Sequence, residues 1–148
     1  TKSVITLSDP NIVKYFRDNL LKLFNNKSHI IFCNEQEALN FSETTNLSQA
    51  QNFLKEITDI YIITLGSKGA ICYDGTDTYK VEGLDVDSKD FTGAGDMFLG
   101  SFMHKYDDGN FLESLSFANF SASKIIQIYG AKFNNKSDYQ NLLENFKY

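Results

Sequence analysis

The segment Gly93-Ala94-Gly95-Asp96 combines residue types that can hold and transfer a phosphoryl group. We expect it to open a helix, where the first backbone N–H groups have no intrahelical acceptor. The two glycines leave these N–H groups unshielded, and together with the positive end of the helix dipole they form an anion site. Asp96 would lie in the first turn, where its carboxylate can accept a proton from an attacking hydroxyl. An aspartate that only complements the dipole is the alternative, and it stays open.

The elements that must position this segment alternate along the chain. Short apolar runs and turn residues predict strands at 3–7, 29–33, 59–65, 69–73 and 78–81. Apolar periodicity and capping residues predict helices at 10–25, 34–41, from 48 onward, 93–106, 110–130 and from 137 onward. Strands that alternate with helices, followed by a hairpin and more helices, are typical of an α/β fold with a mostly parallel sheet.

Several helix ends are predicted from single residues. Pro10 suits the first position of its helix, in which Ile12, Phe16, Leu20 and Leu23 recur at helical spacing. Capping pairs are predicted at three later helix starts, namely Ser48 with Gln51, Asn110 with Glu113, and Ser137 with Gln140. Gly130 is predicted to follow the end of the helix that Asn110 begins.

The composition limits the kinds of partner that the chain can have. Its 148 residues, 42% of them hydrophobic, fit one domain over 1–148 with a buried core. A formal net charge of -5 argues against non-specific binding to nucleic acids and against docking on an acidic membrane surface. Cys33 and Cys72 lie in apolar runs outside any paired motif, so we expect buried, reduced thiols and a cytoplasmic protein.

The longer string from Asp90 to Phe102 contains Asp-x-Thr-Gly-Ala-Gly-Asp followed by Phe, Gly and Phe. This string closely resembles the signature of the ribokinase-like family of carbohydrate and purine kinases. Phe91 departs from the pattern, because the family usually has Thr or a similar small polar residue there. The resemblance implies a ribokinase-like layered α/β/α fold, ATP as phosphate donor, Asp96 as catalytic base, and an anion hole formed by Gly93, Ala94 and Gly95.

A second string, Cys33-Asn34-Glu35-Gln36-Glu37-Ala38, resembles the N-x-x-E motif of this family. The matching residues are Asn34 and Glu37, and the resemblance implies that they help to set the environment of Mg²⁺ and phosphate. Mg²⁺ keeps most of its waters and accepts carboxylate or amide oxygens in its outer sphere, so such a pair is suitable. The alternative is an asparagine that caps the helix, followed by solvated glutamates.

Two further strings resemble the nucleotide-binding elements of the family. Thr64-Leu65-Gly66-Ser67-Lys68-Gly69 is similar to its T-x-G-x-x-G turn, which implies that Thr64, Gly66 and Gly69 lie at the nucleotide. Asn119 lies in a helix segment, 118–123, that resembles the small-residue wall of the adenine pocket. A plain exit from a strand into a hairpin is the alternative for the turn, and helix packing is the alternative for Asn119.

Together these resemblances imply an ATP-dependent phosphotransferase that moves the γ-phosphate to a hydroxyl of a nucleoside or sugar. Residues 6–12 and 125–133 resemble adenosine-kinase-like members, whereas a ribose- or fructose-type sugar kinase and a non-catalytic nucleotide-binding module remain alternatives. Members of the family are about twice as long, so we expect residues 1–148 to be the C-terminal portion of such a kinase. The acceptor-binding residues are expected mainly in the other half, and the isolated portion is expected to self-associate.

Overall fold

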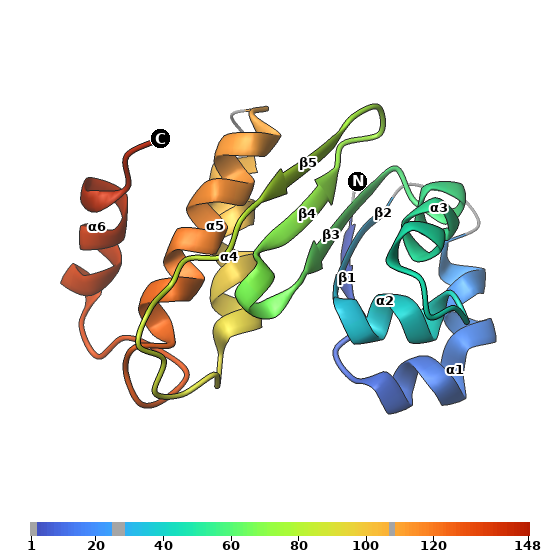
Figure 1. Cartoon of the computed structure of the whole chain (residues 1–148), viewed down its shortest axis with the longest axis horizontal. Coiled ribbons are helices and arrows are strands. Elements are labelled where there is room, and N and C mark those ends of the chain that lie inside the picture. Colours follow the sequence, from blue (N-terminus) through green and yellow to red (C-terminus); the bar gives the residue numbers. More distant parts are fainter. Residues whose placement is uncertain (1–2, 25–28, 107–108) are drawn as a thin grey trace. The chain divides into compact units, whose positions relative to one another are not determined.

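The computed structural model describes residues 3–24, 29–106 and 109–148. Within them the strands are β1 (Ser3–Thr6), β2 (His29–Asn34), β3 (Ile60–Thr64), β4 (Ala70–Tyr73) and β5 (Thr78–Val81) (Figure 1). The helices are α1 (Pro10–Leu23), α2 (Glu35–Phe41), α3 (Leu47–Ile57), α4 (Ala94–Tyr106), α5 (Phe111–Ile125) and α6 (Lys136–Asn145), with a 3-10 turn at Gly66–Lys68. No helix of this described part is long and apolar enough to cross a membrane.

The chain divides into two compact units, which are described separately below. The first unit contains residues 1–66 and 71–79, and the second contains residues 67–70 and 80–148. The strands form one sheet in the order β1-β2-β3-β4-β5, in which β1, β2 and β3 are parallel. The predicted α/β fold with a mostly parallel sheet is therefore confirmed.

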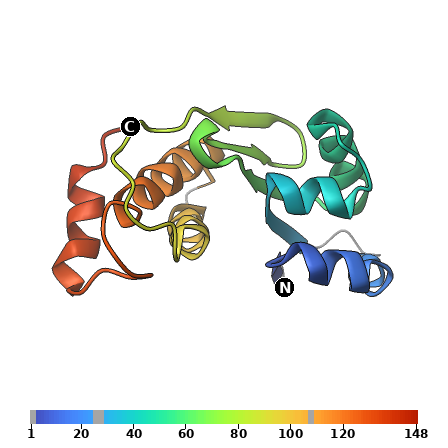
Figure 2. The same cartoon turned by 60° about the horizontal axis from the view of Figure 1, so that its bottom comes forward.

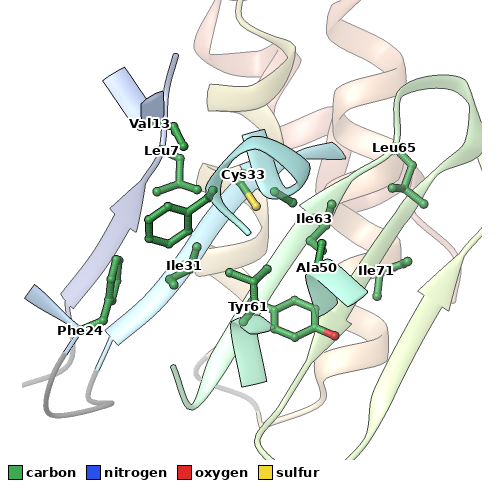
Figure 3. Close-up of a cluster of buried hydrophobic side chains, with 13 residues drawn as sticks. Leu7, Val13, Phe24, Ile31, Cys33, Ala50, Tyr61, Ile63, Leu65 and Ile71 are labelled. Carbon is green, nitrogen blue, oxygen red and sulfur yellow. The ribbon is translucent and has the colours of Figure 1, made fainter. Parts of the chain in front are cut away.

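The hydrophobic core of the first unit lies between the parallel strands and the helices α1, α2 and α3 (Figure 3). β3 is apolar almost throughout, and its residues from Ile60 to Ile63 are buried. The Tyr61 ring stacks on Tyr73 with 5.5 Å between centroids, and Phe24 meets Phe41 edge to face at 6.0 Å. Burial of these continuous apolar runs stabilises the parallel pairing of β2 and β3, so their carboxyl ends lie side by side.

Helix α1 forms where its proline and apolar spacing predict it, but most of the predicted apolar residues do not face the core. Ile12, Phe16 and Leu23 are exposed by 46%, 54% and 55%, whereas Val13 is fully buried. Periodicity alone finds a helix, but it does not decide which of two adjacent apolar residues, such as Ile12 and Val13, faces inward. α1 therefore has an apolar stripe on its outer side.

In the second unit, α4 and α5 lie side by side, as Figures 1 and 2 both show. Phe102 of α4 is fully buried, and its ring contacts Phe111 of α5 with 6.3 Å between centroids. Lys105 pairs with Glu113 at 3.3 Å across the same two helices. This packing joins the second half of α4 to the first turn of α5.

Three of the predicted helix ends are wrong in detail. α3 is capped by Asn46, whose Oδ1 accepts from the Gln49 N–H at 3.1 Å, and Ser48 lies inside the helix. α6 begins after Asn135, whose N–H donates to Asp138 at 3.3 Å, so Ser137 is not its cap. α5 is capped by Asn110 as predicted, but it ends at Ile125, so Gly130 does not directly follow it. In the first two cases an asparagine two residues upstream outcompetes the serine.

Candidate functional site

The glycine segment forms a tight turn directly before α4. Gly93 has φ +79°, a backbone conformation that favours glycine, and a Cβ atom on it would lie 2.5 Å from the carbonyl oxygen of Ala131. Its own carbonyl accepts from the Met97 N–H at 2.9 Å, and the Ala94 N–H donates to the Phe91 carbonyl at 3.2 Å. The Ala94 N–H is thus engaged, whereas the N–H groups of Gly93 and Gly95 donate no recorded hydrogen bond within the described residues and are available to an anion.

Asp96 lies at the third position of α4 and is exposed. Within the described residues, no group forms a hydrogen bond or ion pair with its carboxylate. The side chain borders a pocket of about 400 Å³ that is otherwise mostly apolar, lined by Met97, Gly100, Ser101, His104, Phe117, Ala131, Tyr139, Leu142 and Leu143. A carboxylate that is exposed and uncommitted at the start of a helix is free to meet a ligand hydroxyl.

Asp90 precedes the turn and is, in contrast, fully engaged. Its Oδ1 accepts from the Thr92 N–H and its Oδ2 accepts from the Gly130 N–H, both at 2.9 Å. These bonds, first that from Gly130 and then those from Thr92, lower the pKa of the Asp90 carboxyl below its ordinary value. The carboxylate therefore joins the turn to a segment forty residues later in the chain.

A second tight backbone crossing lies between the 3-10 turn and the residues after β5. Gly69 has φ +96°, and a Cβ atom on it would overlap the Val81 carbonyl. A Cβ atom on Gly83 would overlap the Ser67 carbonyl in the same way. Sequence reasoning missed Gly83, and only its residue type could have indicated such a close approach.

Asn119 of α5 joins this crossing through its side chain. Its Nδ2 donates to the Glu82 carbonyl at 2.9 Å, so it holds the residues that pass Gly69. Two of the predicted nucleotide-binding residues, Gly69 and Asn119, thus contact the same short segment, 81–83. This bond is a structural contact between α5 and the segment after β5, and a contact of Asn119 with a nucleotide stays a prediction.

The other predicted residues lie in the first unit, at the carboxyl ends of two parallel strands. Asn34 ends β2 and is paired in register with Thr64, which ends β3. Gly66 follows with φ +60° and is exposed. The structure therefore brings Asn34 and Thr64 to one edge of the sheet, where ligands of open α/β sheets bind.

Asn34 and Glu37 form a reciprocal cap at the start of α2. Asn34 Oδ1 accepts from the Glu37 N–H at 2.8 Å, while the Glu37 oxygens accept from the Asn34 N–H at 3.0 Å and from its Nδ2 at 2.9 Å. The predicted alternative is therefore correct in its capping asparagine and incorrect in a solvated Glu37, whose side chain is only 5% exposed. Burial, and then the charge of Glu37, raise the pKa of the neighbouring Cys33 thiol well above its ordinary value.

This cap limits how the pair can serve a metal ion. Glu37 is nearly buried and each of its carboxylate oxygens accepts a hydrogen bond, so contact with Mg²⁺ through water molecules suits the pair better than direct coordination. Among the residues that the structure describes, no three His, Cys, Asp or Glu side chains gather as a metal site. Cys33 and Cys72 are buried and unpaired.

Comparison with known proteins decides the family. The model of the pfkB family carbohydrate kinases matches residues 1–138. The chain belongs to the pfkB family. The predicted resemblance to ribokinase-like kinases is therefore confirmed.

Individual pfkB-type relatives agree with this assignment. The ribokinase of Staphylococcus aureus is 30% identical over 137 residues, which are 87% of this chain and 44% of that protein. The cytidine kinase of Thermococcus kodakarensis is 32% identical over 101 residues, or 66% of this chain and 36% of that protein. The crystal structure of the adenosine kinase from Sinorhizobium meliloti matches with a TM-score of 0.86 at 27% identity, over 95% of this chain and 45% of that one. The chain thus spans less than half the length of these three relatives.

Proposed function

We propose that this chain forms the ATP-binding and catalytic C-terminal portion of a kinase that transfers the γ-phosphate of ATP to a hydroxyl group of a nucleoside or sugar. One observation carries the proposal. In a chain of the pfkB family, Asp96 lies exposed in the first turn of α4 without a bonding partner among the described residues, directly after a turn with available glycine N–H groups.

The proposed reaction needs two contributions from this segment. The N–H groups of Gly93 and Gly95 and the positive end of α4 would stabilise negative charge on the phosphoryl group in transfer. Asp96 would take the proton of the acceptor hydroxyl as its oxygen attacks phosphorus. A weak base is sufficient where proton transfer lags behind a loose transition state.

We infer that the nucleotide contacts residues of the strings that resemble the nucleotide-binding elements of the family. We assign Thr64, Gly66 and Gly69 to its contacts, and Asn119 to the orientation of segment 81–83 through the Glu82 carbonyl. Mg²⁺ that accompanies ATP would neutralise charge on the phosphates. Asn34 and Glu37 would contact its water shell only.

The acceptor is proposed to be a nucleoside similar to adenosine, with a sugar such as ribose or fructose as the alternative. The residues that resemble adenosine-kinase-like members and the match to an adenosine kinase structure support the nucleoside, while the similarity to a ribokinase supports the sugar. A cytoplasmic location fits the buried, unpaired Cys33 and Cys72.

A substrate panel tests the function. The complete kinase would be incubated with radiolabelled Mg·ATP and adenosine, cytidine, ribose or fructose, and the phosphorylated products would be separated and counted. We expect transfer to at least one acceptor, and none from the same preparation without an acceptor. ATP binding without transfer to any member of a wide panel of nucleosides and sugars would contradict the proposal and favour a non-catalytic nucleotide-binding module.

A further inference from the structure

Two glycines let the chain cross itself at the open end of the β4–β5 hairpin. Gly69 directly precedes β4, and Gly83 comes shortly after the end of β5. A Cβ atom on Gly69 would overlap the Val81 carbonyl and lie 2.7 Å from the Gly83 nitrogen. A Cβ atom on Gly83 would overlap the Ser67 carbonyl and lie 3.1 Å from the Gly69 nitrogen. The two glycines therefore face each other across the crossing.

Glycine is required at these two positions for different reasons. Gly69 has φ +96°, a backbone conformation that favours glycine by itself, and it is buried. The φ of Gly83 lies outside the left-handed region, so its backbone conformation is open to other residues. At such a position glycine costs stability, because it is the residue with the most freedom in the unfolded chain. The feature that requires glycine at position 83 is therefore the close approach to Ser67 and Gly69.

Helix α5 fixes the segment after β5 through one side chain. Asn119 Nδ2 donates to the Glu82 carbonyl at 2.9 Å, directly before Gly83 in the chain. α5 is itself held by its packing against α4. The backbone of residues 67–69 contacts a segment that is anchored in this way. Its position therefore depends on α5 through Glu82 and Gly83.

We propose that Gly83 is a positioning residue for the nucleotide, because its lack of a side chain lets the segment after β5 support the turn at 67–69. The inference rests on the proposed function, which assigns Gly69 of this turn to the contacts with ATP. Gly83 acts through the backbone of Ser67 and Gly69 and touches no ligand. A support that is the same before and during phosphoryl transfer affects the binding of ATP and leaves the chemical step unchanged.

The test compares Gly83→Ala with Gly75→Ala in the complete kinase. Non-bonded heavy atoms have their optimal separation at about 3.5–4.0 Å, so a Cβ atom at position 83 must push residues 67–69 and 81–83 apart. We expect the Kd and the KM for ATP to rise roughly tenfold in Gly83→Ala, equivalent to about 1.4 kcal/mol. Its kcat and its KM for the acceptor should stay within a few-fold of wild type.

Gly75→Ala is the control for a general loss of stability. Gly75 lies in the loop between β4 and β5 with φ +103°, so alanine is strained there and should lower the melting temperature. A Cβ atom at position 75 would lie 3.3 Å from the Asp59 carbonyl oxygen and would not contact residues 67–69 or 81–83. The affinity for ATP should therefore stay at the wild-type value in this variant.

Amide hydrogen exchange without nucleotide tests the positioning itself. In Gly83→Ala, exchange should accelerate in residues 66–70 and 81–84 and stay unchanged in α4 and α5. Asn119→Asp is a second variant, which removes the amide donor to the Glu82 carbonyl and keeps Gly83. It should accelerate exchange in the same two segments, and it decides the question if Gly83→Ala does not fold.

Three results would overturn the inference. These are wild-type affinity for ATP in Gly83→Ala, an equal loss of affinity in Gly75→Ala, and unchanged exchange of the two segments in the variants that fold. The proposed function fails on a different result, namely binding of ATP without transfer to any acceptor. Weaker binding of ATP by Gly83→Ala would support the inference in that case as well.

Discussion

The starts of α2 and α4 each place a carboxylate at the third helical position, and the two carboxylates have opposite fates. At α2 the preceding residue is Asn34, and Glu37 is drawn back onto it, buried and bonded through both oxygens. At α4 the preceding residue is Gly93, which has no side chain to exchange bonds with. Asp96 stays exposed and has no bonding partner in the described part of the chain.

Two other helix starts, those of α5 and α6, strengthen this comparison. Asn110 with Glu113 at α5 and Asn135 with Asp138 at α6 repeat the arrangement of an asparagine followed by an acid three residues later. Each of these caps uses an acid to satisfy backbone or side-chain N–H groups. At α4 a glycine stands where these helices have a capping asparagine. The N–H groups of Gly93 and Gly95 and the Asp96 carboxylate are therefore left for a ligand, and the helix start has no side-chain cap.

The largest expected effect comes from separating the chain from the rest of the kinase. Residues 1–148 alone should bind ATP weakly and transfer no phosphate, because the proposed acceptor site lies outside them. The β1 edge and the apolar stripe with Ile12, Phe16 and Leu23 should make the isolated chain self-associate, as light scattering after size exclusion would show. Acceptor-dependent phosphorylation by purified residues 1–148 would contradict this prediction.

Glu37→Gln alters the reciprocal cap at the start of α2. Glutamine can accept from only one of the two Asn34 donors and turns its NH₂ toward the other, so we expect a loss of about 1–2 kcal/mol in the free energy of unfolding. Urea unfolding measures it, with the exposed Glu56→Gln as the matched control. In the complete kinase, the Mg²⁺ concentration for half-maximal rate should rise more than the KM for ATP. An unchanged Mg²⁺ titration would restrict Glu37 to its capping role.

Phe91→Thr should have the smallest effect. Phe91 is 70% exposed, and its contribution to the turn is its carbonyl, which accepts from the Ala94 N–H. Restoring the residue type usual in the family should therefore change the free energy of unfolding by no more than about 0.5 kcal/mol, with kcat retained. A larger change in either would mean that the departure at this position has its own consequence for the site.

Local patterns predicted the strands, because the continuous apolar runs of β2 and β3 are buried as expected. Local patterns predicted helix ends incorrectly where two nearby residues could each cap the helix, or where a contact with a distant segment ends it. Ser48 and Ser137 fit a capping pattern, but asparagines at 46 and 135 take the role. Ile126 and Ile128 continue the apolar period of α5, yet the Ile126 carbonyl is taken by Lys89 and Asp90.

The candidate site shows the same limit. The glycine turn and Asp96 are predictable because their residues are adjacent in the sequence, and a turn followed by a helix start depends mainly on such local residues. The capping of Glu37 by Asn34 was predictable as an alternative, but the burial of Glu37 depends on the packing of α2. Gly83 and the bond from Gly130 to Asp90 join residues far apart in the chain, so no local pattern reveals them.

The most direct test of the account measures kcat and melting temperature for Asp96→Asn in the complete kinase, beside the exposed control Asp85→Asn. Because Asp96 is proposed as the base, we expect Asp96→Asn to lose roughly 10²- to 10⁴-fold in kcat, with ATP affinity within a few-fold. Its melting temperature should stay at the wild-type value, because the carboxylate supports no contact in the described structure. Retention of more than a tenth of wild-type turnover would remove Asp96 from the role of base and contradict the account.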